Sequence, residues 1–318
     1  MLAGNAMSTA PFISVVIPAH NEAENIRPTV EAMEAMFRAS GLAGEVVLVD
    51  DGSTDETGKI AGELAHERSF LRVISYAPRR GLSRALETGF LGARGDILVF
   101  YPADLQFDAN DIPAMVAKVR EGFDIVTGWK QGHYEKQIIS GLYNRLSEKL
   151  FATGVHDMNS VKAFRRELLP IFDFRSDFHR YMVVMAVQAG YRAGEVKVTL
   201  RPRASGQSKF GGHWRIVVGT MDLLAVWFQY RFLTRPMLLF GFLGVSLFAL
   251  GLLIGLVALF WRFVFDVGYQ PLLTLTTLLA IMGVVLFGLG LLGESIQMVS
   301  RRVEKLERLL KEDKSGRD

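Results

Sequence analysis

Two long stretches without a charged residue restrict the structures open to this chain more than any other feature. They run from Met237 to Phe260 and from Leu272 to Leu292. As helices rising about 1.5 Å per residue, both are long enough to cross the roughly 30 Å hydrocarbon core of a bilayer. Gly268 and Pro271 lie between them and favour a turn. The sequence therefore predicts two transmembrane helices, at about 237–260 and 272–292, within residues 236–300. A pair of buried helices in a large soluble core is the alternative, which such long uncharged stretches disfavour.

Basic residues around these stretches predict their orientation. Arg215, Arg231 and Arg235 precede the first stretch, and Arg301, Arg302, Lys305 and Arg308 follow the second. The connection between the stretches contains one basic residue, Arg262. Because loops rich in Lys and Arg stay in the cytoplasm, we expect a multi-pass protein of the inner (cytoplasmic) membrane with both termini in the cytosol.

The remaining segments complete the expected domain organisation. Residues 1–10 contain no sustained apolar segment and are expected to form a disordered leader rather than a secretory signal. Residues 211–235 combine Trp214 and Trp227 with arginines, which is typical of an interfacial amphipathic helix. Residues 301–318 are expected to form a charged cytosolic tail.

The composition narrows the possible partners. Half of the 318 residues are apolar, which is too many for one simple soluble domain of this length. The 36 basic and 33 acidic residues give a formal net charge of +3, so bulk charge offers little support for a nucleic-acid partner. The absence of cysteine fits a reducing compartment.

Five short apolar segments characterise residues 11–210. They span residues 13–17, 45–49, 71–76, 96–101 and 123–127, and segments with helical spacing separate them. Strands that alternate with helices predict an α/β fold with a mostly parallel sheet and helices on both faces. Ligand groups gather at the carboxyl ends of the strands in such folds, so we expect the chemistry there.

Polar residues follow three of these segments. The three sequences are Pro18-Ala19-His20-Asn21-Glu22, Asp50-Asp51-Gly52-Ser53-Thr54-Asp55 and Pro102-Ala103-Asp104-Leu105-Gln106. Each by itself is compatible with an ordinary turn, and Ser53 or Asp55 with a helix N-cap. Their occurrence in order, each after an apolar segment, favours one binding site at one edge of a sheet.

The first strand–helix turn lacks the glycine-rich fingerprint of dinucleotide-binding proteins, which argues against a nicotinamide cofactor. The phosphates of a ligand would then have to be held in another way. A divalent cation on Asp104 would neutralise a diphosphate without requiring glycine in the turn.

These motifs resemble those of the family 2 glycosyltransferases. Over nearly the whole chain, the resemblance is to the polyprenyl-phosphate glycosyltransferases related to dolichol-phosphate mannose synthase. It implies a GT-A-type, Rossmann-like domain in residues 11–210, in which P-x-x-N-E and D-D-x-S motifs hold the base and ribose of a nucleotide-sugar. The residues implied in binding the nucleotide-sugar are Pro18, Ala19, Asn21, Glu22, Asp50, Asp51, Ser53 and Asp104.

The metal motif of that family, D-x-D-x-Q, falls on residues 102–106. Asp104 and Gln106 match it, whereas Pro102 replaces the first aspartate. Because proline offers no side-chain ligand, the resemblance implies Mg²⁺ or Mn²⁺ held by Asp104, Gln106, phosphate oxygens and water.

Three further segments match the family. Residues 157–165 resemble a stretch that begins with D-x-N and ends with F-R, and residues 178–181 resemble an H-R segment. The third segment matches R-x-x-G-x-S-K with Arg203, Ser208 and Lys209. Two cations and a hydroxyl suit a phosphate, and we assign Arg203 and Lys209 to the leaving diphosphate as a hypothesis. A solvated basic turn is the alternative.

The family holds its acceptor phosphate with an arginine and an R-x-x-x-S pair, and here these positions correspond to Lys130, Lys136 and Ser140. Lysine keeps the positive charge but lacks the planar fork of arginine. A spacing of four places Lys136 and Ser140 on one face of a helix. The alternative is a surface helix with an incidental basic residue.

The function implied by the resemblance is inverting transfer of a sugar from a nucleotide-sugar to a polyprenyl phosphate, undecaprenyl or dolichyl, in cell envelope glycan synthesis. A UDP-sugar is favoured, and UDP-glucose, UDP-galacturonate and GDP-mannose all stay open. Since the second pKa of a phosphate monoester is near 6, the acceptor is largely ionised at pH 7 and no general base is needed.

Two alternatives to this function stay open. One is a transferase of the same family with a soluble or polymeric acceptor, in which the hairpin is a tether. The other is a membrane scaffold that has lost metal binding, which Pro102 suggests. A homo-oligomer also stays open, because Gly251 and Gly255 have the spacing of small-residue contacts between membrane helices.

Overall fold

The computed structural model describes residues 12–131, 137–175, 178–201, 214–231, 236–266, 268 and 270–315. The chain divides into two compact units, Met1–Ile216 and Val217–Asp318, and each is described by itself.

The first unit is built on a seven-stranded sheet in the order β3-β2-β1-β4-β6-β5-β7. The strands are β1 (Ile13–Ala19), β2 (Gly44–Asp51), β3 (Leu71–Tyr76), β4 (Ile97–Phe100), β5 (Ile125–Gln131), β6 (Lys162–Arg165) and β7 (Ala193–Thr199). Strands β1 to β4 pair in parallel, as do β5 and β7, whereas β6 runs antiparallel between β4 and β5. The five segments that the sequence predicted as strands are β1 to β5.

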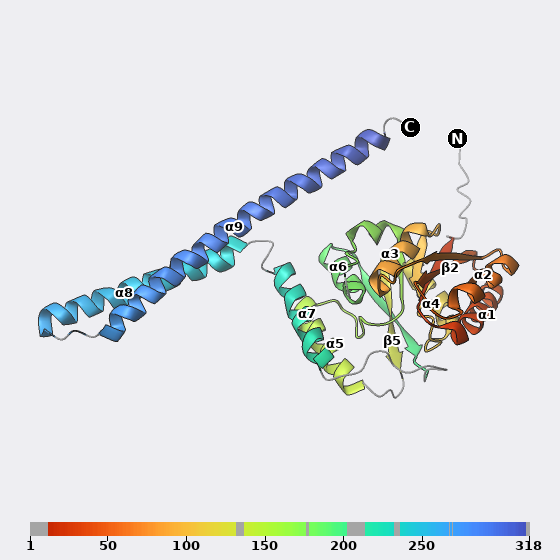
Figure 1. Ribbon diagram of the computed structural model, residues 1–318, viewed down its shortest axis with the longest axis horizontal. Helices are drawn as coiled ribbons and strands as arrows, with labels where there is room; N and C mark the ends of the chain where they lie inside the picture. Colours follow the sequence, from red (N-terminus) through yellow and green to blue (C-terminus); the bar gives the residue numbers. More distant parts are fainter. Residues whose placement is uncertain are drawn as a thin grey trace. The chain divides into compact units, whose positions relative to one another are not determined.

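Helices cover both faces of this sheet (Figure 1). The helices of this unit are α1 (Ala23–Ser40), α2 (Thr57–Glu67), α3 (Leu82–Gly92), α4 (Ile112–Arg120), α5 (Gln137–Phe151) and α6 (Met182–Gln188), with short 3₁₀ segments η1 (Ala109–Asp111), η2 (Arg166–Ile171) and η3 (Phe178–Tyr181). The mostly parallel α/β fold predicted from the sequence is confirmed.

The two sides of β1 show why a continuous apolar strand forms here. Ile13, Val15 and Ile17 are fully buried in a core shared with α1, α2 and α4. Val16 points to the other face and packs against α3, where a Cβ added to Gly89 would lie 2.3 Å from Val16 Cγ1. A strand covered on both faces needs apolar residues at every position, which the sequence ISVVI nearly provides.

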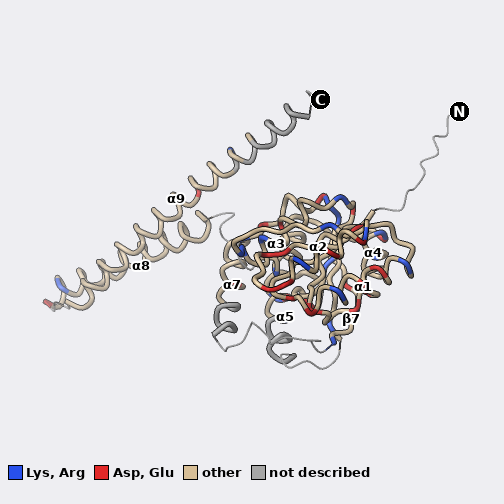
Figure 2. The backbone as a smooth tube through the Cα atoms, turned by 45° about the vertical axis from the view of Figure 1, so that its right-hand side comes forward, with Lys and Arg blue, Asp and Glu red and all other residues tan. Residues whose placement is uncertain are grey.

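The second unit contains α7 (Trp214–Arg231) from Val217 onward, a π-helical turn η4 (Met237–Gly241), α8 (Phe242–Phe265) and α9 (Gln270–Ser315). Met237–Phe265 and Gln270–Ser300 are long and apolar enough to cross a membrane. Their large side chains are mostly exposed, for example 77% for Phe242 and 84% for Phe263, as lipid-facing side chains would be. Figure 2 shows charges along the described part of this hairpin near the α8–α9 turn and at a few positions in the second half of α9.

Glycines bring α8 and α9 into close contact. A Cβ on Gly244 would lie 2.7 Å from the carbonyl oxygen of Gly283, and a Cβ on Gly283 would lie 2.7 Å from that of Gly244. Gly251 and Gly255 face Thr276 of α9 in the same way. The small residues Gly251 and Gly255, whose spacing suggested a possible homo-oligomer, thus pack within one hairpin. Close approach of the two helix backbones favours helix–helix association in lipid.

Candidate active site

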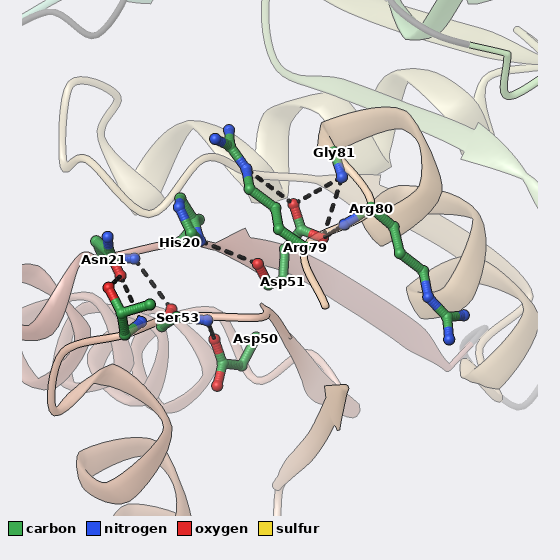
Figure 3. A network of polar contacts seen from close by, with 9 residues as sticks. His20, Asn21, Asp50, Asp51, Ser53, Arg79, Arg80 and Gly81 are labelled. Atoms are coloured by element: carbon green, nitrogen blue, oxygen red, sulfur yellow. Dashed lines mark hydrogen bonds and ion pairs between the residues drawn. The ribbon is translucent and has the colours of Figure 1, made fainter. Parts of the chain in front are cut away.

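The carboxyl ends of β1 and β2 are joined by hydrogen bonds (Figure 3). The Nδ1 atom of His20 lies 2.9 Å from the carbonyl oxygen of Asp51. The Asn21 amide donates to Ser53 Oγ at 3.0 Å, and the Thr54 amide donates to Asn21 Oδ1 at 2.8 Å. Asn21 has a φ of 53°, a left-handed conformation that Asn tolerates better than most residues. Pro18 and Ala19 are the last residues of β1. The P-x-x-N-E and D-D-x-S motifs therefore lie together at one edge of the sheet.

Glu22 continues this edge at the start of α1. Its amide donates to Thr57 Oγ1 at 2.9 Å, and its carboxylate accepts from Asn25 Nδ2 at 2.6 Å. Asp55 lies beside them and accepts from the Thr57 amide at 3.0 Å. Burial raises the pKa of Asp55, but hydrogen bonds from the side chain and backbone of Thr57 outweigh it and hold the pKa below its usual value. Asp55 is thus an ionised anchor between α1 and α2.

Asp50 and Asp51 point in different directions at the end of β2 (Figure 3). Asp50 is 7% exposed, and its Oδ1 accepts from the Ser53 amide at 3.0 Å. Gly58 makes room for this carboxylate, because a Cβ there would lie 2.5 Å from Asp50 Oδ2.

Asp51 holds the turn that follows β3. Its carboxylate accepts from the Arg80 amide at 2.7 Å and from the Gly81 amide at 2.9 Å, and it lies 3.6 Å from Arg79 Nε. Burial and the Asp51 charge together raise the pKa of the nearby Tyr76 phenol. The Asp51 carboxylate therefore has a clear structural partner, and its role in base or ribose binding stays a prediction.

The turn after β4 carries Asp104 and Gln106. The Gln106 amide lies 3.3 Å from Asp104 Oδ1, and Leu105 between them has a left-handed φ of 57°. Within the part of the chain that the structure describes, no three His, Cys, Asp or Glu residues form a cluster that could hold a metal alone. One carboxylate and one amide oxygen nevertheless suit Mg²⁺ or Mn²⁺, which takes its other ligands from substrate phosphates and water.

The end of β7 is bound to this same turn. The Arg201 amide donates to the Gln106 carbonyl at 2.8 Å, and the Arg201 guanidinium forms an ion pair with Asp108. Arg201 leads into the R-x-x-G-x-S-K segment, but Arg203, Ser208 and Lys209 lie outside the described residues.

Lys130 lies near the end of β5 in a buried ion pair. Its ammonium nitrogen is 3.2 Å from Asp157 Oδ2 and donates to the Asn159 carbonyl at 2.9 Å. The side chains are 11% and 3% exposed. Lys136 lies outside the described residues, and Ser140 falls in α5 at a position whose side chain the structure does not describe. The predicted grouping of these residues around one phosphate therefore stays a prediction.

The structure adds two buried groups that lie in segments matched to the family but were not among the predicted site residues. Lys162 begins β6, is fully buried, and donates to the Ser160 carbonyl at 2.9 Å. His179 is also buried, with Nδ1 3.1 Å from Ser83 Oγ, and burial lowers its pKa to about 3. Lys162, inside the stretch that matches D-x-N to F-R, and the His of the H-R segment were visible in the sequence, but the position of β6 was not.

Together these elements bring acidic and amide groups from the ends of β1, β2 and β4 to the same sheet edge as the lysines of β5 and β6. Cations beside polar donors can hold two anionic ligands and stabilise charge on a leaving group.

Comparison with known proteins identifies relatives of this chain by sequence. A sequence model described as "Glycosyl transferase family 2" matches residues 14–193. The chain is 33% identical to a dodecaprenyl-phosphate galacturonate synthase of Rhizobium johnstonii over 297 residues, or 89% of this chain and 87% of the relative. It is 27% identical to an undecaprenyl-phosphate 4-deoxy-4-formamido-L-arabinose transferase of Klebsiella pneumoniae over 292 residues, or 89% and 88%.

Solved structures show the same fold. Glucosyl-3-phosphoglycerate synthase from Mycobacterium tuberculosis, in complex with Mn²⁺, UDP and phosphoglyceric acid, has a TM-score of 0.53 and 21% identity over 70% of this chain and 78% of the other. The same protein with Mg²⁺ and UDP has a TM-score of 0.53 and 21% identity over 68% and 80%.

Proposed function

The chain belongs to glycosyl transferase family 2, and we propose that it transfers a sugar from a nucleotide-sugar to a polyprenyl phosphate. The observation that carries this proposal is the buried Lys130–Asp157 pair on the sheet edge that also bears Asp50 and Asp104. It provides a cation for a second anion beside a nucleotide-sugar site. The relatives named for dodecaprenyl- and undecaprenyl-phosphate support a lipid phosphate as that anion.

The donor would occupy the edge formed by β1 and β2. The proposed contacts come from Pro18, Ala19, Asn21, Glu22, Asp50, Asp51 and Ser53. We favour a UDP-sugar, with GDP-mannose as the competing donor, because structures of the same fold contain UDP.

Mg²⁺ or Mn²⁺ would be held by Asp104 and Gln106, and when bound it would neutralise charge on the donor diphosphate. Arg203 and Lys209 are proposed to bind the same diphosphate from the segment after Arg201. Ser208 would add a hydroxyl.

Lys130, with Lys136 and Ser140, would orient the acceptor phosphate. One of its oxygens attacks the anomeric carbon, so a carbon–oxygen bond to the lipid phosphate forms as the bond to the nucleoside diphosphate breaks. The acceptor oxygen is already ionised at pH 7, so no proton has to be removed. Attack from the face opposite the leaving group inverts the anomeric configuration. The work of the protein is positioning two anions and stabilising the leaving charge.

The α8–α9 hairpin is proposed to cross the inner membrane with both termini in the cytosol, because the basic residues flank the hairpin rather than its turn. An interfacial segment at residues 211–235 would keep the catalytic unit near the headgroups, where a lipid phosphate is presented.

Transfer by the purified full chain in detergent tests this function. Undecaprenyl phosphate would be incubated with labelled UDP-glucose, UDP-galacturonate or GDP-mannose and Mg²⁺, and the product extracted into organic solvent. We expect one donor to give a labelled lipid that depends on the phosphate, with undecaprenol as the control acceptor. Donor turnover that is equal with phosphate and alcohol would contradict a lipid-phosphate acceptor.

A further inference from the structure

Because β6 runs antiparallel to its neighbours, it places a lysine toward the edge of the sheet at which the parallel strands end. Lys162 is the first residue of β6 and pairs with Phe100, the last residue of β4, on one side and with Thr127 of β5 on the other. In a parallel strand the first residue would lie at the opposite edge. β6 therefore begins at the level where β4 ends, and β5 continues past it to Gln131.

Lys162 and Lys130 bind the same short turn. Lys162 Nζ donates to the Ser160 carbonyl at 2.9 Å, and Lys130 Nζ donates to the Asn159 carbonyl at 2.9 Å. Asp157, at the start of that turn, is 3.2 Å from Lys130 Nζ. A change in charge at one lysine is therefore felt at the other through a buried, poorly screened path.

Among the described groups whose charges act on Lys162, two are positive and one is negative. The described groups whose charges act on Lys162 are Asp157, Lys130 and Arg180. His179 faces the same region and stays neutral, since burial and the charges of Lys162 and Arg180 lower its pKa to about 3. Burial lowers the pKa of Lys162 to about 7; Asp157 opposes this, and Lys130 and Arg180 add to it.

We propose that Lys162 is a positioning residue of the acceptor site that takes up a proton when the phosphate of the lipid acceptor binds beside Lys130. This inference rests on the proposed function and adds a charge-matching step to it. Above pH 7 the resting enzyme holds Lys162 largely as the neutral amine, because burial and the charges of Lys130 and Arg180 disfavour the ammonium form. An arriving phosphate dianion favours the ammonium form, whose charge then holds the Asn159–Ser160 turn and Lys130 in place against the anion.

Calorimetric titration of the full chain in detergent tests this step. Undecaprenyl phosphate would be added at pH 8 in two buffers of different ionisation enthalpy, and the difference in heat gives the protons taken up per ligand bound. We expect wild type to take up close to one proton at pH 8 and much less at pH 6, where Lys162 already carries one. Titration with UDP and Mg²⁺ should show no such uptake.

Three variants at Lys162 test whether this residue is the group that takes up the proton. Lys162→Met and Lys162→Gln should lose the uptake and bind the lipid at least tenfold more weakly, whereas Lys162→Arg should bind without uptake. Lys59→Met, at an exposed lysine on α2, serves as the matched control and should behave as wild type.

Wild type that binds the lipid with no uptake at pH 8 overturns the inference and leaves the proposed function standing, as does unchanged uptake in Lys162→Met. The wild-type comparison between pH 8 and pH 6 still tests the proton uptake on lipid binding even if a variant does not fold. Uptake with UDP instead of the lipid also overturns it. Wild type that neither binds nor glycosylates the lipid overturns the proposed function itself.

Discussion

The ammonium group of Lys130 lies 3.2 Å from a carboxylate oxygen of Asp157, and the residues that precede each of them in the chain, Trp129 and His156, stack at 4.1 Å with an interplanar angle of 9°. Glu195 on β7 accepts from the His156 amide at 2.7 Å and contacts its ring at the same distance. Neighbouring side chains of a strand point to opposite faces, so the loop before β6 is held to β5 from two sides. This arrangement fixes Asp157 and supports the first two predictions.

Lys130→Met should lower both stability and transfer. It leaves the Asp157 carboxylate buried without its close ion-pair partner, at an expected cost of about 3 kcal/mol in the free energy of unfolding. Denaturation of the full chain in detergent measures this cost. Lys130→Met/Asp157→Asn should be more stable than the sum of the single changes predicts, because the two side chains interact. Additive effects would show that the pair is not coupled.

His156→Ala should act mainly on the acceptor. Loss of the stack on Trp129 is expected to cost about 1 kcal/mol of stability, and the looser Asp157 should raise the KM for polyprenyl phosphate more than the KM for the donor. Steady-state kinetics with each substrate varied in turn checks this difference. His66→Ala, at an exposed position on α2, is the control. A rise confined to the donor KM would contradict this role of the loop.

Asp104→Ala should reduce kcat by about 100-fold or more, since it removes the one carboxylate proposed to hold the divalent ion. Chelation of divalent ions by EDTA should abolish activity in wild type, and Mg²⁺ or Mn²⁺ should restore it. The same exchange at the exposed Glu63 of α2 should leave turnover unchanged. Undiminished turnover in Asp104→Ala would rule out the proposed metal site.

The stability of the protein should rise with pH above 7 through Lys162. Its pKa is about 7 in the folded chain and near 10.4 in an unfolded one, so between these values the unfolded state binds more protons. Stability from this group then increases with pH, by at most about 1.4 kcal/mol per pH unit, and is constant below pH 7. Thermal unfolding of wild type and Lys162→Met between pH 6.5 and 9 measures this. Parallel curves for the two proteins would contradict the shifted pKa.

Gly244→Leu and Gly283→Leu should separate α8 from α9. A side chain at either position would meet backbone atoms of the opposite helix at 2.7 Å, so the helices would have to move apart. Gly288→Leu is the matched control, because nothing lies within 4 Å of a Cβ added there. Thermal stability and the yield of monodisperse protein in detergent should fall for the first two variants and not for the control. Equal losses in all three would show that glycine packing does not hold the hairpin.

The sequence by itself determined the features that depend on local patterns. Apolar segments predicted β1 to β5, and long uncharged stretches predicted the two helices of the hairpin. Both predictions are possible because the pattern of burial and the length of a helix depend on residues that are consecutive in the chain. Strand-end motifs placed Asn21, Asp50 and Asp104 after the carboxyl ends of β1, β2 and β4 for the same reason.

Only the tertiary structure decided where β6 and β7 lie. β6 has four residues and begins with Lys162, and β7 carries Glu195 and Lys197, so neither shows an apolar run. Their pairing depends on contacts between distant segments, and it places Lys162 beside Phe100. Long-range packing also turned the Asp51 carboxylate toward Gly81 and Gly251 toward α9. The local sequence specifies which residues can be buried and where the chain can turn. The direction of each strand, and the segment that each strand or side chain contacts, depend on which distant segments pack together.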